Sequence, residues 1–242
     1  MRVLAIARYP VKSMQGEQLD AAPLETSGVS GDRRWGVFDQ ATATVLSAKR
    51  EPALLAASAK WVDDGQRAVI CLPDGTEVTA GTQAADTELS HWLGRPVCCR
   101  VSPEGEPAFV DLAPVHLLTT ASVAAAIATY PEGQWDVHRF RPTIFVDTDT
   151  DFDTDTDEDL GFVEEAWIGE TLTVGGATLQ VLCATPRCSM VTRAQRNLHH
   201  DAGIEQAINR HNATNLGVYA IVTRPGLIAV GEPVTPPGLR SR

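Results

Sequence analysis

The sequence lacks any long apolar run, and this shortage limits where the protein can work. The first residues, MRVLAIARYPVKS, hold an apolar run of only five residues, which is too short for the apolar region of a secretory signal peptide. No run approaches the roughly 18 apolar residues that span a membrane. We therefore expect a soluble, cytoplasmic protein with no membrane partner.

Cysteine pairs at metal-binding spacing are lacking, and the number of cysteines is odd. The five cysteines form no C-x-x-C pair, so neither a disulfide framework nor a zinc ribbon is expected. The interval between Cys183 and Cys188 matches the first part of the plant-type ferredoxin spacing C-x4-C-x2-C, but no cysteine supplies the second part. An iron–sulfur cluster is therefore not expected either.

The chain also has few positive charges. Its 20 Lys and Arg are outnumbered by 31 Asp and Glu, which gives a formal net charge of −11. Residues 147–159, DTDTDFDTDTDED, hold eight of the acidic charges, and the remainder of the chain would carry −3. Neither value gives the basic face that nucleic-acid binding needs. The acidic stretch fits the ligand positions of an EF-hand loop, but Phe152 stands where that loop needs glycine. We interpret it as a solvated insertion that binds calcium weakly at most.

The patterns that are present predict a mainly β protein with a few helices, an α+β chain of two β-barrel-like units. A Pro/Gly/Glu-rich connection suggests a boundary near residue 105, giving domains 1–105 and 106–238. Short alternating stretches bounded by turn residues predict strands at 2–10, within 19–48 and at 140–147, and hairpins at 67–80, 171–184 and 216–234. The last two hairpins would turn at Gly175-Gly176 and at Arg224-Pro225-Gly226.

Helical spacing appears in three places. Residues 86–94 predict a helix that ends at Gly94. An alanine-rich helix follows Thr120 or Ser122 as its N-cap and ends before Pro131 and Gly133. A third helix spans 201–212, with Ile204, Ala207, Ile208 and His211 on one face.

Three short motifs place cations beside hydroxyls or glycines at expected strand ends. Guanidinium and backbone N–H groups bind phosphate well, so these motifs could converge on an anion. Alternatively, each cation pairs with a carboxylate of its own barrel. The motifs are YPVKS with Lys12 and Ser13, GDRRW with Arg33 and Arg34, and HRFRPT with Arg139, Arg141 and Thr143.

The stretch ATPRCSMVT, residues 184–192, places Cys188 after Pro186 and Arg187. The proline ends a strand, and a loop position beside a cation favours the thiolate that acts as a nucleophile or a metal ligand. A histidine distant in sequence could serve as a general base for such a thiol. His199 and His200 suggest a polar loop, and we assign no role to His116, His138 or His211. The other cysteines, Cys71, Cys98, Cys99 and Cys183, read as small buried side chains.

Taken in order, YPVKSMQG, GDRRWGVFD, FRPTIFVD, EEAWIGETLTVGG, PRCSMVT and LGVYAIVTRPGLIAVGEPV resemble the MOSC family over nearly the whole chain. The pattern is most similar to that of the mitochondrial amidoxime-reducing component and its bacterial counterparts. The resemblance implies an N-terminal MOSC β-barrel domain followed by a MOSC domain. It also carries a family-level association with pyridoxal phosphate.

The resemblance further implies a molybdenum cofactor of the molybdopterin type, with Cys188 as a sulfur ligand to the metal. Three departures from the family pattern affect this inference: Thr143 stands where asparagine is frequent, Pro186 replaces a serine found in some relatives, and the segment after Cys188 is unlike the family's. The residues that the resemblance assigns to cofactor binding are Lys12, Ser13, Arg33, Thr120, Ser122, Arg141, Thr143 and Arg187.

The activity implied by the resemblance is the reduction of small N-oxygenated compounds at a Cys-ligated molybdenum. No flavin or iron–sulfur motif is present, so the electrons would come from a separate flavin, haem or iron–sulfur protein. Two alternatives stay open: a protein that carries the cofactor or sulfur without turnover, and a metal-free thiol hydrolase or transferase that uses Cys188.

Overall fold

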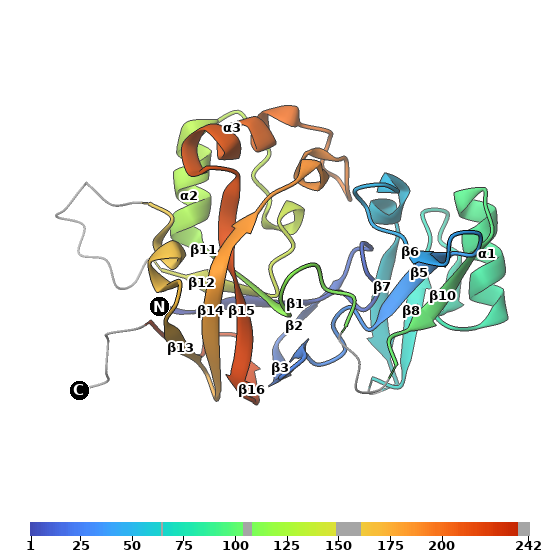
Figure 1. Ribbon diagram of the computed structural model, residues 1–242, viewed down its shortest axis with the longest axis horizontal. Helices are drawn as coiled ribbons and strands as arrows, with labels where there is room; N and C mark the ends of the chain where they lie inside the picture. The colour runs from blue at the N-terminus through green and yellow to red at the C-terminus, as the bar shows by residue number, and fades with distance from the viewer. Residues whose placement is uncertain (64, 104–107, 149–160, 237–242) are drawn as a thin grey trace. The chain divides into compact units, whose positions relative to one another are not determined.

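The computed structural model describes residues 1–63, 65–103, 108–148 and 161–236 (Figure 1). Within these ranges, strands are far more numerous than helices. The prediction of a mainly β protein with a few helices is therefore confirmed. In the part of the chain that is described, no helix has both the length and the apolar content to cross a membrane.

The chain forms two compact units that are interleaved in sequence. Unit 1 comprises Met1–Ala7, Gln18–Ser30 and Leu112–Arg242, and unit 2 comprises Arg8–Glu17 and Gly31–Asp111. This arrangement differs from a single boundary near residue 105, because strand β1 (Arg2–Arg8) pairs with β12 (Ile144–Asp147). The beginning of the chain thereby becomes part of the unit that is built mostly from its second half.

Unit 1 is organised around an eight-stranded sheet in the order β17-β13-β14-β15-β11-β12-β1-β2. From β17 to β1 the neighbouring strands pair antiparallel, except for β11 and β12, which pair in parallel. Strand β2 lies beside β1 at the edge of the sheet. A second sheet in this unit has the order β16-β3-β4. The strands not yet given bounds are β2 (Glu17–Leu19), β3 (Ala21–Glu25), β4 (Gly28–Val29), β11 (Val115–Thr119), β13 (Thr171–Val174), β14 (Ala177–Pro186), β15 (Asn215–Arg224), β16 (Gly226–Ala229) and β17 (Val234–Thr235).

Both faces of the large sheet are buried at β11, which lies between β15 and β12. Leu117 packs into one apolar cluster with Val181 and Val218, whereas its neighbour Leu118 packs into another with Phe140. Successive strand side chains point to opposite faces, so one strand serves both cores. Each fully buried side chain of this size stabilises the fold by about 1.5–3 kcal/mol.

Helices cover the face that Leu118 occupies. Helices α2 (Thr120–Thr129) and α3 (Ala202–Asn212) lie together at one end of β15 (Figure 1). The short 3-10 helices η2 (Val137–Arg139) and η4 (Ser189–Thr192) pack beside them, and η3 (Val163–Trp167) packs against β11. The helical cover therefore gathers where β14 ends, which is where Cys188 follows.

Unit 2 has two three-stranded sheets, in the orders β10-β5-β6 and β7-β8-β9. Helix α1 (Gln83–Leu93) begins at an N-cap made by Thr82 and ends at Gly94, whose φ of 68° is left-handed. The remaining elements are β5 (Trp35–Asp39), β6 (Thr44–Val45), η1 (Pro52–Ala56), β7 (Ser58–Val62), β8 (Arg67–Cys71), β9 (Glu77–Thr79) and β10 (Val97–Val101).

Local predictions succeed where turn chemistry decides the structure. Strands β8 and β9 form the hairpin expected at 67–80, and β13 and β14 form the one expected around Gly175-Gly176. The helix expected at 86–94 ends at Gly94 but begins earlier, at Gln83. Among the cysteines expected to be buried, Cys98 and Cys99 are buried, and Cys71 and Cys183 are half-buried.

The prediction of a hairpin at 216–234 is wrong. Strand β15 pairs with β14 and β11, whereas β16 pairs with β3 in the other sheet. Pro225 has no N–H to donate, so it interrupts the ladder, and the chain then enters a different sheet.

Two element ends and one helix face also differ from expectation. Thr119, not Thr120 or Ser122, caps α2. The strand expected at 140–147 begins only at Ile144, because Arg141 has a positive φ and Pro142 follows it. His211 is exposed, although Ile204, Ala207 and Ile208 form the buried face of α3 as predicted. Of the acidic stretch 147–159, all but Asp147 and Thr148 lies outside the described residues.

Candidate functional site

Cys188 lies at the turn between β14 and η4. Pro186 is the last residue of β14, and Cys188 is the N-cap of η4, with an extended backbone at φ −118° and ψ 174°. Its carbonyl oxygen accepts a hydrogen bond of 3.1 Å from Val191 N. The side chain is half-buried. The turn therefore holds a thiol that is partly open to a ligand.

A strained turn supports this position from the neighbouring strand. The backbone N–H of Arg187 donates to Thr214 O at 2.7 Å. Ala213 and Thr214 have φ values of 45° and 72°. Residues other than glycine adopt such left-handed conformations only at a cost in free energy. Such strain persists where the surrounding structure enforces it, and it is frequent at functional sites.

The side chain of Arg187 links the end of β14 to the segment before β12. Its Nη2 donates to Phe140 O at 2.7 Å, and its guanidinium lies over the Phe140 ring, 5.5 Å from the centroid. Its Nη1 lies 3.4 Å from Nε2 of His116. The sequence suggested this cation as a thiolate neighbour; these contacts direct its charge toward Phe140 and His116.

Thr143 clamps the backbone of His116. Its hydroxyl accepts from His116 N at 3.0 Å and donates to His116 O at 3.1 Å, and the side chain is fully buried. Arg141, two residues earlier, is also buried and has a φ of 54°. Since Phe140 contacts Arg187, the structure brings Arg141, Thr143 and Arg187 into one region of unit 1.

Thr120 and Ser122 have different neighbours. Thr120 Oγ1 lies 2.9 Å from Thr148 Oγ1, and the fully buried Ser122 hydroxyl donates to Glu164. Glu164 also accepts from Thr119 Oγ1 at 2.7 Å. These hydroxyls brace the start of α2 against η3 and the end of β12. Their assignment to cofactor binding stays a prediction, and the structure does not bring them to Arg187.

The carboxyl group of Glu164 is strongly affected by this burial. Burial raises its pKa, and the hydrogen bonds from Ser122 and Thr119 oppose the rise only in part. One carboxyl oxygen, Oε1, has no hydrogen-bond partner among the described residues. A proton is therefore held more tightly here than on an exposed glutamate.

Lys12, Ser13 and Arg33 belong to unit 2. Lys12 Nζ donates to Phe109 O at 3.0 Å and pairs with Asp111 at 2.5 Å. Ser13 Oγ accepts from Ala48 N at 2.9 Å, and Arg33 pairs with Asp32. Both cations thus pair with carboxylates of their own unit. Their proposed contact with an anion stays a prediction.

Ser13, Arg33 and Arg141 share one unusual feature of the backbone. Their φ values are 70°, 49° and 54°, and few other non-glycine residues in the described chain have a positive φ. An observed conformational outlier is a reason to suspect a functional constraint. The backbone strain is therefore a second reason, besides the types of their side chains, to consider these residues as part of a site.

Comparison with family models decides the family. The model for the MOSC domain matches residues 104–235, and the model for the MOSC N-terminal beta barrel domain matches residues 1–95. The chain belongs to the MOSC family. The MOSC domain is associated with molybdenum-cofactor binding, and nothing in these matches supports pyridoxal phosphate.

One solved structure shows the same fold over nearly the whole chain, at low sequence identity. The YuaD protein from Bacillus subtilis is 10% identical, with a TM-score of 0.50, and the match covers 96% of this chain and 93% of that one. YiiM from Geobacillus stearothermophilus is 16% identical over 51% of this chain and 53% of that one, with a TM-score of 0.33. A structure described as a hypothetical protein is 13% identical over 97% and 67%, with a TM-score of 0.45. No curated protein sequence matches the chain.

His116 of this MOSC protein is a site residue that the sequence did not reveal. It is buried, its ring lies 5.7 Å from that of Tyr219, and it meets Arg187, 71 residues away. Gly217 makes room for it: a Cβ at that glycine would lie 2.4 Å from His116 Nε2. A single histidine in an apolar strand carries no signal that could have identified this contact.

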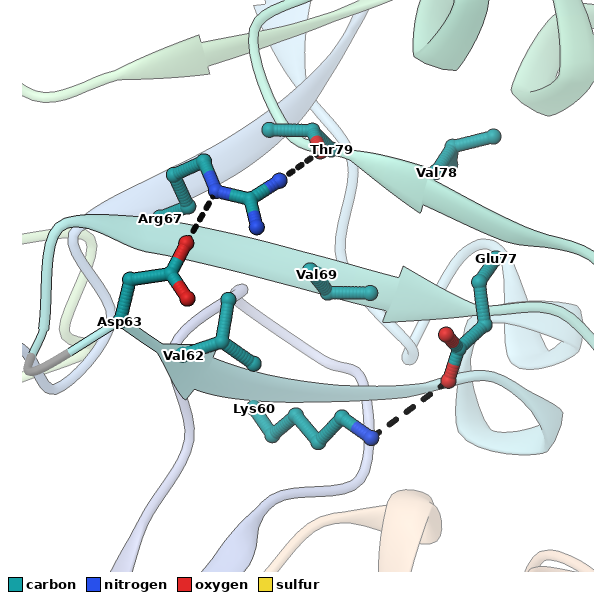
Figure 2. Close-up of a pocket in the computed structure, with 8 residues that line it drawn as sticks. All are labelled: Lys60, Val62, Asp63, Arg67, Val69, Glu77, Val78 and Thr79. Atoms are coloured by element: carbon teal, nitrogen blue, oxygen red, sulfur yellow. Dashed lines mark hydrogen bonds and ion pairs between the residues drawn. The ribbon is translucent and has the colours of Figure 1, made fainter.

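An open groove of about 400 Å³ lies on the outer face of β7, β8 and β9 in unit 2 (Figure 2). Lys60 pairs with Glu77 at 3.5 Å and Arg67 with Asp63 at 2.6 Å, and all four side chains are more than half exposed. None of the residues predicted for the cofactor lines it. We interpret it as a solvated sheet face. No group of three or more His, Cys, Asp or Glu side chains within the described ranges is arranged to hold a metal ion.

Proposed function

We propose that this MOSC protein binds a molybdenum cofactor through the thiolate of Cys188 and reduces small N-oxygenated compounds. The observation that carries the proposal is the position of Cys188, a half-buried thiol between the end of β14 and η4. The family's association with the molybdenum cofactor supports it.

The residues around Cys188 have the chemistry that such a cofactor requires. A thiolate is a soft, anionic ligand that binds metals strongly. Arg141 and Arg187 supply positive charge in the same unit, which suits an anionic group. Thr185, in β14, is fully buried, and its hydroxyl has no hydrogen-bond partner among the described residues. A buried hydroxyl without a partner is costly unless a ligand completes it.

In this proposal Cys188 binds the metal, and the protein keeps the thiol oriented. Arg187 holds the start of the turn through Phe140 and His116. Thr143 holds His116 in turn. When bound, a molybdenum cofactor supplies oxygen-atom transfer: an N–OH compound, two electrons and two protons give the N–H compound and water. A separate electron-donor protein would supply the electrons. Lys12, Ser13 and Arg33 stay predictions as anion-binding residues of unit 2.

The test compares metal content among three proteins made in a host that synthesises the cofactor. The wild type and Cys183→Ala should contain molybdenum and pterin, whereas Cys188→Ala should lose the molybdenum. Cys183 is the matched control because it is a half-buried cysteine on β14. A metal-free wild type, or equal metal in Cys188→Ala, contradicts the proposal.

Turnover is tested separately, with a chemical electron donor and hydroxylamines or amidoximes as substrates. The reductase proposal predicts conversion to the amine or amidine by the wild type. Bound metal without conversion contradicts it and favours a cofactor carrier.

A further inference from the structure

Arg139 is a buried cation. Its side chain donates hydrogen bonds only to uncharged oxygens among the described residues. It is the last residue of η2 and is fully buried. Its Nε donates to Gln134 O at 2.8 Å, and Nη2 donates to the Gln134 side chain at 3.3 Å. The sequence suggested an anion or a carboxylate as its partner; no carboxylate bonds to it among the described residues.

The other three side-chain hydrogen bonds of Arg139 lead to the segment that follows Cys188. Nη1 donates to Val191 O at 3.3 Å and to Arg193 O at 3.0 Å, and Nη2 donates to His199 O at 2.7 Å. One guanidinium thus ties together carbonyl groups spread over nine residues. A lysine, with three donors on one atom, could not reach them all.

This segment has little regular structure of its own. After η4 ends at Thr192, residues 193–200 form no helix, and one isolated bridge joins Gln195 to Leu198. Gln134 adds a second tie, since its side chain accepts from His199 N at 3.0 Å. An irregular segment of this kind opens readily unless such contacts hold it.

One of the residues that Arg139 holds is also hydrogen-bonded to Cys188. Val191, which accepts from Arg139 through its carbonyl, donates through its N–H to Cys188 O. Two consecutive hydrogen bonds therefore connect the guanidinium to the backbone of the cysteine. Burial disfavours the charge of Arg139 and lowers its pKa, while Asp201 and Asp136 oppose this effect. Placing a cation here is costly, and four backbone carbonyls offset the cost.

We propose that Arg139 is a positioning residue that fixes residues 189–199 and thereby the direction of the Cys188 thiol. Its importance for metal binding rests on the proposed function. The effect on the thiol does not, so it is measured on the protein without cofactor.

The experiment is alkylation of the native protein by iodoacetamide, followed by peptide mapping of each cysteine. Cys71 and Cys183, both half-buried, are internal references in the same molecule. In Arg139→Ala the alkylation rate of Cys188 relative to these references should rise by about fivefold or more, because the segment opens locally. Arg210→Ala, which removes an exposed arginine of α3, should leave the ratio unchanged.

A rescue experiment separates positioning from general loosening. Guanidinium chloride at about 20 mM, far below denaturing concentrations, should return the ratio in Arg139→Ala toward the wild-type value. The same salt should not change the ratio in the wild type. A folded Arg139→Ala with a wild-type ratio, or a raised ratio that guanidinium leaves unchanged, contradicts the proposal. If Arg139→Ala does not fold, Arg139→Lys decides by the same ratio.

The two proposals can fail independently. A metal-free wild type with a raised ratio in Arg139→Ala contradicts the molybdenum function and supports the positioning role. A metal-loaded wild type with an unchanged ratio in Arg139→Ala supports the molybdenum function and contradicts the positioning role.

Discussion

Arg187 contacts Phe140 twice, through a hydrogen bond of 2.7 Å to its carbonyl oxygen and through the face of its ring, 5.5 Å from the centroid. The two residues are separated by 47 positions in the chain. Arg187 thus links the end of β14, the strand that leads to Cys188, to the segment of Arg141 and Thr143.

Replacing Arg187 by lysine should therefore destabilise the protein although the charge is kept. An ammonium cannot donate to Phe140 O and cover the ring at once, so we expect a loss of about 1–2 kcal/mol in the free energy of unfolding. Urea unfolding measures this value. Arg224→Lys, at an exposed arginine of β15, is the control and should change it by less than about 0.5 kcal/mol. Equal effects of the two substitutions would contradict the anchoring role.

Replacing Gly217 by alanine should destabilise the protein far more than the same change at Gly94, another glycine with a left-handed backbone. A Cβ at Gly217 would lie 2.4 Å from His116 Nε2, and its φ is 85°. Gly94 has a φ of 68° and nothing within 4 Å of the added Cβ. Gly94→Ala should cost only the left-handed strain of about 1–2 kcal/mol, and Gly217→Ala should cost at least about 2 kcal/mol more. Comparable losses in urea unfolding would show that His116 is not held in place.

The buried carboxyl of Glu164 should make stability depend on pH. Its pKa is raised above the reference value of 4.5 by burial, so the folded state holds a proton that the unfolded state releases. Its contribution is therefore fully present below pH 4.5 and declines as the pH rises through the raised value. Glu164→Gln should abolish this decline and be the more stable protein at higher pH, as measured by urea unfolding across pH.

Ser122→Ala sharpens this prediction. Ser122 donates to the carboxylate and lowers the pKa of Glu164, so its removal should move the decline to higher pH. If Ser122 acts only in this cluster, the molybdenum content of Ser122→Ala should equal that of the wild type. A loss of metal in a stably folded Ser122→Ala would support the assignment of this serine to cofactor binding.

The sequence allows prediction where neighbouring residues decide the structure. Gly175-Gly176 and Gly94 mark a turn and a helix end because glycine adopts left-handed backbone without penalty. Cys188 could be placed at a strand end because Pro186 stops the ladder. The ordered motifs were sufficient to indicate the MOSC family.

Relationships between distant segments could not be predicted in this way. Arg2 pairs with Asp147 across 145 positions, and nothing local signals that β1 joins the second half of the chain. His116 and Arg139 act through contacts 71 and 52 to 60 positions away. Such partners are selected by packing of the whole unit, which overrides the local pattern that had suggested a carboxylate or an anion for Arg139.

The most direct test of the central claim is the number of sulfur ligands on the molybdenum, measured by X-ray absorption on metal-loaded protein. The account predicts that Cys188→Ser lowers the count by one sulfur relative to the wild type, because the serine hydroxyl replaces the thiolate. Cys183→Ser should match the wild type. An unchanged sulfur count in metal-loaded Cys188→Ser would contradict the assignment of Cys188 as the ligand.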